Sequence, residues 1–195
     1  ILYRLVGSEM CIRDSKNPEK SENLDKGSFF DLLKIHQLWF ILPLVLIHYA
    51  PVAGIRGLWI GPYINDNFYN ASNLAFATTA MSLAMIAGTF AYGPMDRIFG
   101  TRKWIIFIGS SVSLVSLICL ALLNEISFAV SVILFCTLGF FGMSYPLVIA
   151  HGRSFSPENL TVRCVTLLNM FAIGGVGIFQ FLTGRIFSKL TEVHN

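Results

Sequence analysis

Several polar side chains that could do chemistry lie inside long apolar stretches of this chain. His48 can take up or release a proton near neutral pH. Arg56 carries a permanent positive charge and a planar set of N–H donors that suits an anion. The remaining candidates offer hydroxyl groups to a polar solute: Tyr49, Thr137, Ser144 and Tyr145.

Each charged or ionisable candidate also has a structural interpretation. A histidine within an apolar segment can relay protons or simply hydrogen-bond between helices. Arg56 lies 18 residues beyond Leu38, or about 27 Å along a straight helix, which predicts the outer third of its segment. In the outer third, Arg56 could extend its side chain to the interface or pair with another residue. Nearer the bilayer centre, its charge would cost about 2.5–3.5 kcal/mol, and Arg56 would then be a candidate for a functional role.

The segments that hold these residues are predicted to be membrane-spanning helices. The chain of 195 residues is 54% hydrophobic and 13% charged, against about 25% charged for a soluble domain. Its mean hydropathy is +0.66. No Lys, Arg, Asp or Glu lies between Lys34 and Arg56 or between Lys103 and Glu125, and such stretches are long enough to cross a bilayer. We therefore expect an all-α integral membrane protein with the lipid bilayer as its partner.

The same composition argues against several other classes. A net charge of +3 without a basic face gives no reason to expect nucleic acid as a partner. No cysteine pair has a metal-binding spacing, so neither a metal site nor a cofactor is expected. The four histidines are scattered and no acid lies within a predicted span, so we do not expect an enzyme.

Five apolar segments predict five spans within a membrane domain of residues 28–188, namely 38–64, 73–95, 104–123, 126–150 and 162–186. Pro43 and Pro51 predict that the first span is kinked or broken. Residues 1–15 resemble a translated sequencing adaptor and are expected to be a non-native leader. Residues 16–27 are expected to form a cytoplasmic linker, and residues 189–195 a truncated tail.

The polar connections between these spans differ in charge. Cations lie in the region before the first span, in the connection that ends with Arg102 and Lys103, and in the connection that holds Arg153 and Arg163. The two alternate turns, around residues 65–72 and 124–125, contain no Lys or Arg. Because cationic loops stay in the cytoplasm, this pattern places the linker on that side, in what we expect to be a bacterial inner membrane.

The connection between the second and third spans resembles the conserved loop of the major facilitator superfamily, whose pattern is Gly-x-x-x-Asp-Arg-x-Gly-x-Arg-Arg/Lys. The matching residues are Gly93, Asp96, Arg97, Gly100, Arg102 and Lys103. Gly93 stands three rather than four residues before Asp96, and Gly100 four rather than three residues after it, as in a degenerate copy from the C-terminal half of the family. A later run is similar to the family's entry into its eleventh helix: Pro157, Arg163, Asn169, Gly174, Gly175 and Gly184.

This resemblance covers about residues 28–188 and implies helices seven to eleven of twelve. The fold would be a five-helix part of a six-helix transporter half-bundle, and the missing N-terminal half and last helix would be its partners. The implied function is that of a secondary active transporter fragment, which moves a small polar or anionic solute by alternating access. The alternatives are a truncated scaffold that does not transport and a polytopic membrane enzyme.

The resemblance also implies roles for residues. The loop acid Asp96 and its neighbour Arg97 would latch one conformation of the transporter, whereas Arg102 and Lys103 could simply fix the orientation in the membrane. The family builds its substrate cavity partly from helices seven and ten, which correspond to the first and fourth spans here. That places the six candidates in the cavity: His48, Tyr49, Arg56, Thr137, Ser144 and Tyr145.

Overall fold

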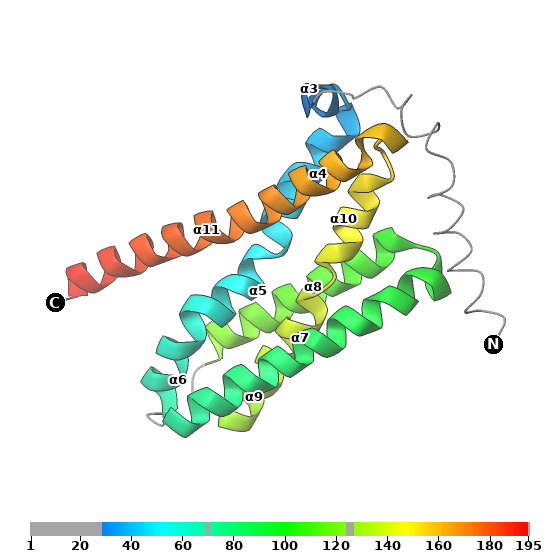
Figure 1. Cartoon of the computed structure of the whole chain (residues 1–195). Helices are drawn as coiled ribbons and strands as arrows, with labels where there is room; N and C mark the ends of the chain where they lie inside the picture. Colours follow the sequence, from blue (N-terminus) through cyan, green and yellow to red (C-terminus); the bar gives the residue numbers. More distant parts are fainter. Residues whose placement is uncertain (1–28, 69–70, 124–126, 195) are drawn as a thin grey trace.

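The computed structural model of the chain describes residues 29–68, 71–123 and 127–194, and within these ranges every regular element is a helix. Five helical stretches are long and apolar enough to cross a membrane, which confirms the all-α prediction at this level (Figure 1). They are His36–Phe68, Ser72–Met95, Arg102–Leu122, Phe128–Arg153 and Glu158–Glu192. The expected leader 1–15 and linker 16–27 lie outside the described residues.

The first of these stretches is interrupted. After the short α3 (Phe29–Leu33), it consists of α4 (His36–His48), α5 (Ala50–Gly54), the π-helix η1 (Ile55–Trp59) and α6 (Ile60–Phe68). Pro43 lies inside α4 and Pro51 near the start of α5. An interruption was expected there, because proline lacks the backbone N–H that would continue the helix. The helix continues to Phe68, beyond the end expected at residue 64.

The fourth stretch is also interrupted, although the sequence suggested one helix over 126–150. α9 (Phe128–Gly142) ends, Met143 and Ser144 intervene, and α10 (Tyr145–Arg153) begins. Pro146 explains the break, because a proline fits the first turn of a helix but cannot continue the hydrogen bonds of the preceding one.

The charged loop predicted at residues 96–103 is much shorter in the structure. α7 (Ala71–Phe99) continues through the backbone of Asp96 and Arg97, and α8 (Arg102–Leu122) begins only two residues after Gly100. Gly100 has a φ of 59°, the left-handed conformation that commonly ends a helix and that glycine adopts without strain. The side chains of Asp96 and Arg97 lie outside the described part of the structure.

The last stretch begins with the 3₁₀ turn η2 (Glu158–Leu160) and continues as α11 (Thr161–His194). Its helix therefore extends past the end expected at residue 186 and through most of the segment 189–195 that was expected to be a tail. In Figure 1, α11 runs beside α4 and α5, while α7, α8 and α9 form the other part of the bundle.

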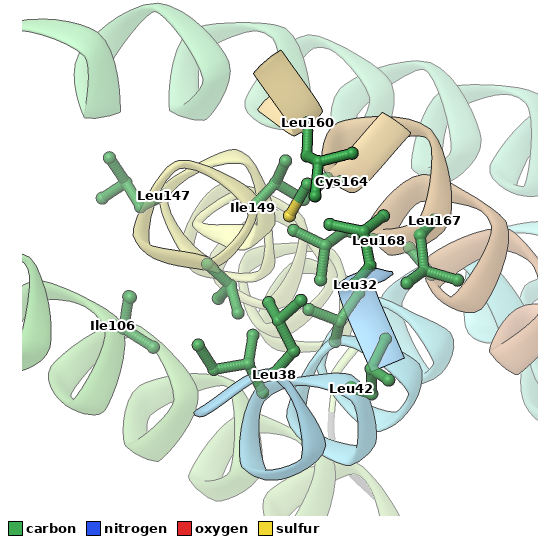
Figure 2. Close-up of a cluster of buried hydrophobic side chains, with 14 of the residues drawn as sticks. Leu32, Leu38, Leu42, Ile106, Leu147, Ile149, Leu160, Cys164, Leu167 and Leu168 are labelled. Carbon is green, nitrogen blue, oxygen red and sulfur yellow. The ribbon is translucent and has the colours of Figure 1, made fainter. Parts of the chain in front are cut away.

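Glycines allow close approach where these helices cross. A Cβ on Gly175 of α11 would overlap the carbonyl oxygen of Leu46 on α4, and a Cβ on Gly88 of α7 would overlap that of Phe140 on α9. Small residues at such crossings are typical of helix packing in membranes. One apolar core joins α3, α4, α8, α10 and α11 (Figure 2), with these labelled members: Leu32, Leu38, Leu42, Ile106, Leu147, Ile149, Leu160, Cys164, Leu167 and Leu168.

Candidate functional site

The two interrupted stretches meet at their interruptions. His48 is the last residue of α4, and its Nε2 lies 2.8 Å from the hydroxyl of Ser144, in the break between α9 and α10. The other ring nitrogen, Nδ1, lies 3.2 Å from the hydroxyl of Ser110 on α8. We call His48, Ser110 and Ser144 the histidine cluster. It joins three of the five long apolar stretches through one side chain.

Backbone carbonyls complete the hydrogen bonds of this cluster. The Ser110 hydroxyl donates to the carbonyl of Ile106 at 2.8 Å, and the Ser144 hydroxyl donates to that of Phe141 at 3.0 Å. With both hydroxyl protons on these carbonyls, each serine oxygen can accept a hydrogen bond from a different nitrogen of a protonated His48. A neutral His48 fits too, because either serine can turn its proton toward the unprotonated nitrogen. The protein itself therefore provides a hydrogen-bond partner for each nitrogen of the ring.

Three tyrosines lie near members of the histidine cluster. The Tyr92 hydroxyl of α7 donates to the Phe141 carbonyl at 3.2 Å, and this is the same carbonyl that accepts from the Ser144 hydroxyl. Tyr49 and Tyr145, the neighbours of His48 and Ser144 in sequence, stack with their ring centroids 4.5 Å apart. Four of the six predicted cavity residues therefore lie together at this junction, in two pairs.

The Ser144–His48 contact has the length of a nucleophile–base pair in an enzyme. However, Ser144 has no exposed surface, and the group that orients His48 from the other side is a serine rather than an acid. A cavity of about 320 Å³ between α4 and α8 reaches His48, Ser110 and Ser113, but its other lining residues are apolar or glycine. The buried Ser113 hydroxyl has no partner among the described residues. The geometry favours a structural junction over a hydrolytic site.

Arg56 lies in a separate and more polar place. Its Nε donates to the Ser82 hydroxyl of α7 at 3.1 Å, and the Arg56 side chain is exposed. An open hollow of about 420 Å³ lies between η1 and α7. We call it the arginine hollow, and its lining residues are Arg56, Gly57, Thr78, Thr79 and Ser82. Within the described ranges Arg56 makes no ion pair. The hollow therefore presents an uncompensated positive charge beside three hydroxyl groups.

The contact with Ser82 revises the expected depth of Arg56. Ser82 is the eleventh of the 24 residues in the stretch Ser72–Met95, so it lies close to the middle of that helix. The hydrogen bond therefore places the Arg56 guanidinium beside the middle of that helix, whereas the residue count from Leu38 predicted the outer third of the first segment. The straight-helix count from Leu38 does not include the prolines of α4 and α5 or the wider turn of η1, the π-helix to which Arg56 itself belongs.

Other predicted residues do not join either place. Thr137 lies on α9, and its hydroxyl donates to the Ile133 carbonyl of its own helix at 2.8 Å. Arg153 ends α10, Arg163 lies in the first turn of α11, and both are exposed. Gly93 and Lys103 are also exposed, at the end of α7 and the beginning of α8, and Arg102 is half-buried.

The structure adds residues that the sequence did not single out. Ser110 and Tyr92 complete the surroundings of His48 and Ser144, and Thr79 and Ser82 complete those of Arg56. Serines and threonines are common in spanning helices and often bond to their own backbone, so their type alone carries little information. The sequence does show hydroxyl residues close together at positions 78, 79 and 82. Nothing in the sequence indicates that they lie next to Arg56, because that contact depends on the fold.

Among the residues the structure describes, no three His, Cys, Asp or Glu side chains come together in a way that could hold a metal ion. No family model, curated protein or solved structure matches the chain. The interpretation of the two polar places therefore depends on their own chemistry.

Proposed function

We propose that this chain is part of a secondary transporter of the major facilitator type, which moves a small polar or anionic solute across a membrane by alternating access. In this proposal the five long helices span the bilayer, and the remaining helices of the same protein complete the pathway. The observation that carries the proposal is the meeting of two interrupted helices at polar side chains well inside their apolar stretches.

Interrupted helices are informative because hydrocarbon cannot satisfy free backbone groups. Non-helical backbone at membrane depth is tolerated only where protein buries it or where it lines a water-filled cavity. Transporters use such breaks near the middle of the membrane to form solute and ion sites. Here the interruption after His48 and the interruption at Ser144 lie against each other, and both are supported by side-chain hydrogen bonds.

The outer surface of the helices supports membrane insertion. Large apolar side chains project outward along the apolar stretches, with Phe40 71% exposed and Phe90 77% exposed. Water would disfavour so much contiguous apolar surface, whereas lipid would accommodate it. The connections with cations, between α7 and α8 and between α10 and α11, lie toward one end of the bundle in Figure 1. We propose that this end faces the cytoplasm, in a bacterial inner membrane.

Transport is tested with the full-length protein, including the helices encoded on either side of this segment, reconstituted in lipid vesicles. A panel of radiolabelled small carboxylates, phosphate, sugars and amino acids is offered with and without a proton gradient. Saturable uptake of one solute class above protein-free vesicles is the expected result. Absence of uptake and of counterflow for every solute, by protein that is shown to be folded and inserted, would argue for a scaffold instead.

A further inference from the structure

We infer that the arginine hollow is the binding site for a small monocarboxylate anion, with Arg56 as its charged anchor. This inference rests on the proposed transport function and names the class of solute. The hollow lies between η1 and α7, away from the histidine cluster, and its volume of about 420 Å³ is sufficient for a small organic acid.

The hydrogen bonds of Arg56 leave most of its donors unused. A guanidinium has five N–H groups. In the described structure Arg56 uses its Nε on Ser82 at 3.1 Å, and it makes no other hydrogen bond or ion pair. The Ser82 hydroxyl in turn donates to the Thr78 carbonyl at 2.7 Å. Ser82 therefore fixes the orientation of the guanidinium, while the terminal N–H groups remain available in a fork that fits a carboxylate.

The threonines of the hollow have different roles. The Thr78 hydroxyl donates to the carbonyls of Leu74 and Ala75, at 2.8 and 3.1 Å, so its proton is already used. Thr79 is exposed, and its hydroxyl makes no hydrogen bond within the described ranges. It is the hydroxyl that can donate to a bound anion. A carboxylate would thus be held by a charged fork and one neutral donor.

The charge of the hollow selects a monoanion. Among the described residues that line the hollow, Arg56 alone is charged, so one negative charge is neutralised. A phosphate dianion would leave one negative charge without a partner among these residues. The depth of the site argues against a lipid headgroup as the source of the anion, because Ser82 lies near the middle of its helix whereas headgroups lie at the membrane surfaces.

The helix geometry around Arg56 is an independent observation. η1 is a π-helix of five residues, Ile55–Trp59, within an otherwise α-helical stretch. π-Helical turns are rare and frequently occur at functional sites. The wider turn includes Arg56 and Gly57, both of which line the hollow.

The test is equilibrium binding of radiolabelled acetate, lactate and inorganic phosphate to the full-length protein in detergent. We expect saturable binding of acetate or lactate in preference to phosphate. Arg56→Ala should weaken that binding at least about tenfold, and Arg56→Lys should recover only part of it because an ammonium lacks the planar fork. Arg185→Ala is the matched control, because Arg185 is also an exposed arginine of an apolar stretch but lies over the Phe181 ring of α11.

The outcomes separate this inference from the transport proposal. Carboxylate binding that is lost in Arg56→Ala, in a protein without uptake, would support the site and contradict transport. Uptake or binding of a carboxylate with unchanged affinity in Arg56→Ala would overturn the site and leave transport standing. The inference is also overturned if neither acetate nor lactate binds, or if short-chain phosphatidylglycerol occupies the site and the two carboxylates do not displace it.

Discussion

The histidine cluster and the arginine hollow show two ways in which polar groups are accommodated among apolar helices. At the histidine cluster, both ring nitrogens of His48 face serine hydroxyls, and those hydroxyls have backbone carbonyls as acceptors. In the arginine hollow, Arg56 has one hydrogen bond and no ion pair in the described structure. The protein itself supplies the hydrogen-bond partners of the histidine cluster, whereas the arginine hollow has space and unused N–H donors for a ligand.

This difference assigns the two places different roles. A buried polar group that is fully hydrogen-bonded contributes to a defined packing of helices, and its loss is expected to reduce stability. A charged group that is incompletely paired at membrane depth is a candidate for binding a ligand. We therefore expect substitutions at the histidine cluster to act mainly on folding and substitutions in the arginine hollow to act mainly on binding.

The largest effect is expected where the helix that carries His48 is held against α11. Gly175→Ala would place a Cβ on the backbone carbonyl of Leu46, which cannot move away as a side chain can. We expect a loss of about 3 kcal/mol in unfolding free energy, at the upper end of the usual cost of overpacking, because the added Cβ forces the two backbones apart. Thermal unfolding in detergent measures it. Gly174→Ala is the control, because a Cβ there meets nothing within 4 Å, and its stability should not fall.

The next largest effect is expected at the histidine cluster itself. His48→Ala removes the shared partner of Ser110 and Ser144 and leaves a void between α4 and α8, so we expect a loss of about 2–3 kcal/mol. His48→Gln retains one donor and one acceptor and should lose less. His36→Ala, at an exposed histidine of the same helix, should change the unfolding temperature little. Equal stability of the His36 and His48 variants would contradict the structural role.

The arginine hollow should respond in the opposite way. Arg56→Ala removes one exposed side chain and one hydrogen bond, so we expect the unfolding free energy to change by no more than about 0.5 kcal/mol. The stabilisation of the protein by added acetate, which ligand binding to the folded state produces, should disappear in this variant. A large fall in stability without acetate would show that Arg56 is needed for packing and would remove the contrast between the two regions.

The smallest effect is expected for the free hydroxyl of the hollow. Thr79→Val keeps the shape of the side chain and removes one neutral donor, which should weaken carboxylate binding about threefold to tenfold. Thr137→Val is the matched control, because the Thr137 hydroxyl bonds to the Ile133 carbonyl of its own helix and lines neither the hollow nor the histidine cluster. Binding measured by displacement of labelled acetate should be the same in Thr137→Val as in the unmodified protein.

The helices were predictable from the sequence because long uncharged segments, and the prolines and polar residues that interrupt them, are local signals. Apolar runs indicated five helices of spanning length, and Pro43 and Pro51 indicated that the first would bend. The break at Ser144 was not foreseen, although Pro146 was visible, because a proline inside an apolar run can also be absorbed as a kink. The loop around Gly100 was expected to be longer than it is. Charged residues can lie in a loop or continue a helix, so their presence from Asp96 onward did not show where α7 ends.

The polar places were harder to predict because they depend on contacts between distant segments. His48 and Ser144 are 96 residues apart, and their pairing follows from where two interrupted helices cross. A straight-helix count to Arg56 includes neither the prolines of α4 and α5 nor η1, the π-helix to which Arg56 belongs. Hydroxyl partners such as Ser82 and Ser110 carry no distinctive local pattern, so only the three-dimensional arrangement separates them from other serines of the chain.

The most direct test of the distinction between the two regions is a kinetic comparison of Arg56→Gln with His48→Gln. Initial rates of carboxylate uptake are measured against concentration for the full-length protein in vesicles, normalised to the amount of folded protein. We predict that Arg56→Gln raises the apparent KM about tenfold or more, and that His48→Gln lowers the amount of folded protein but leaves both KM and the normalised maximal rate close to those of the unmodified protein. A raised KM in His48→Gln together with an unchanged KM in Arg56→Gln would contradict the account.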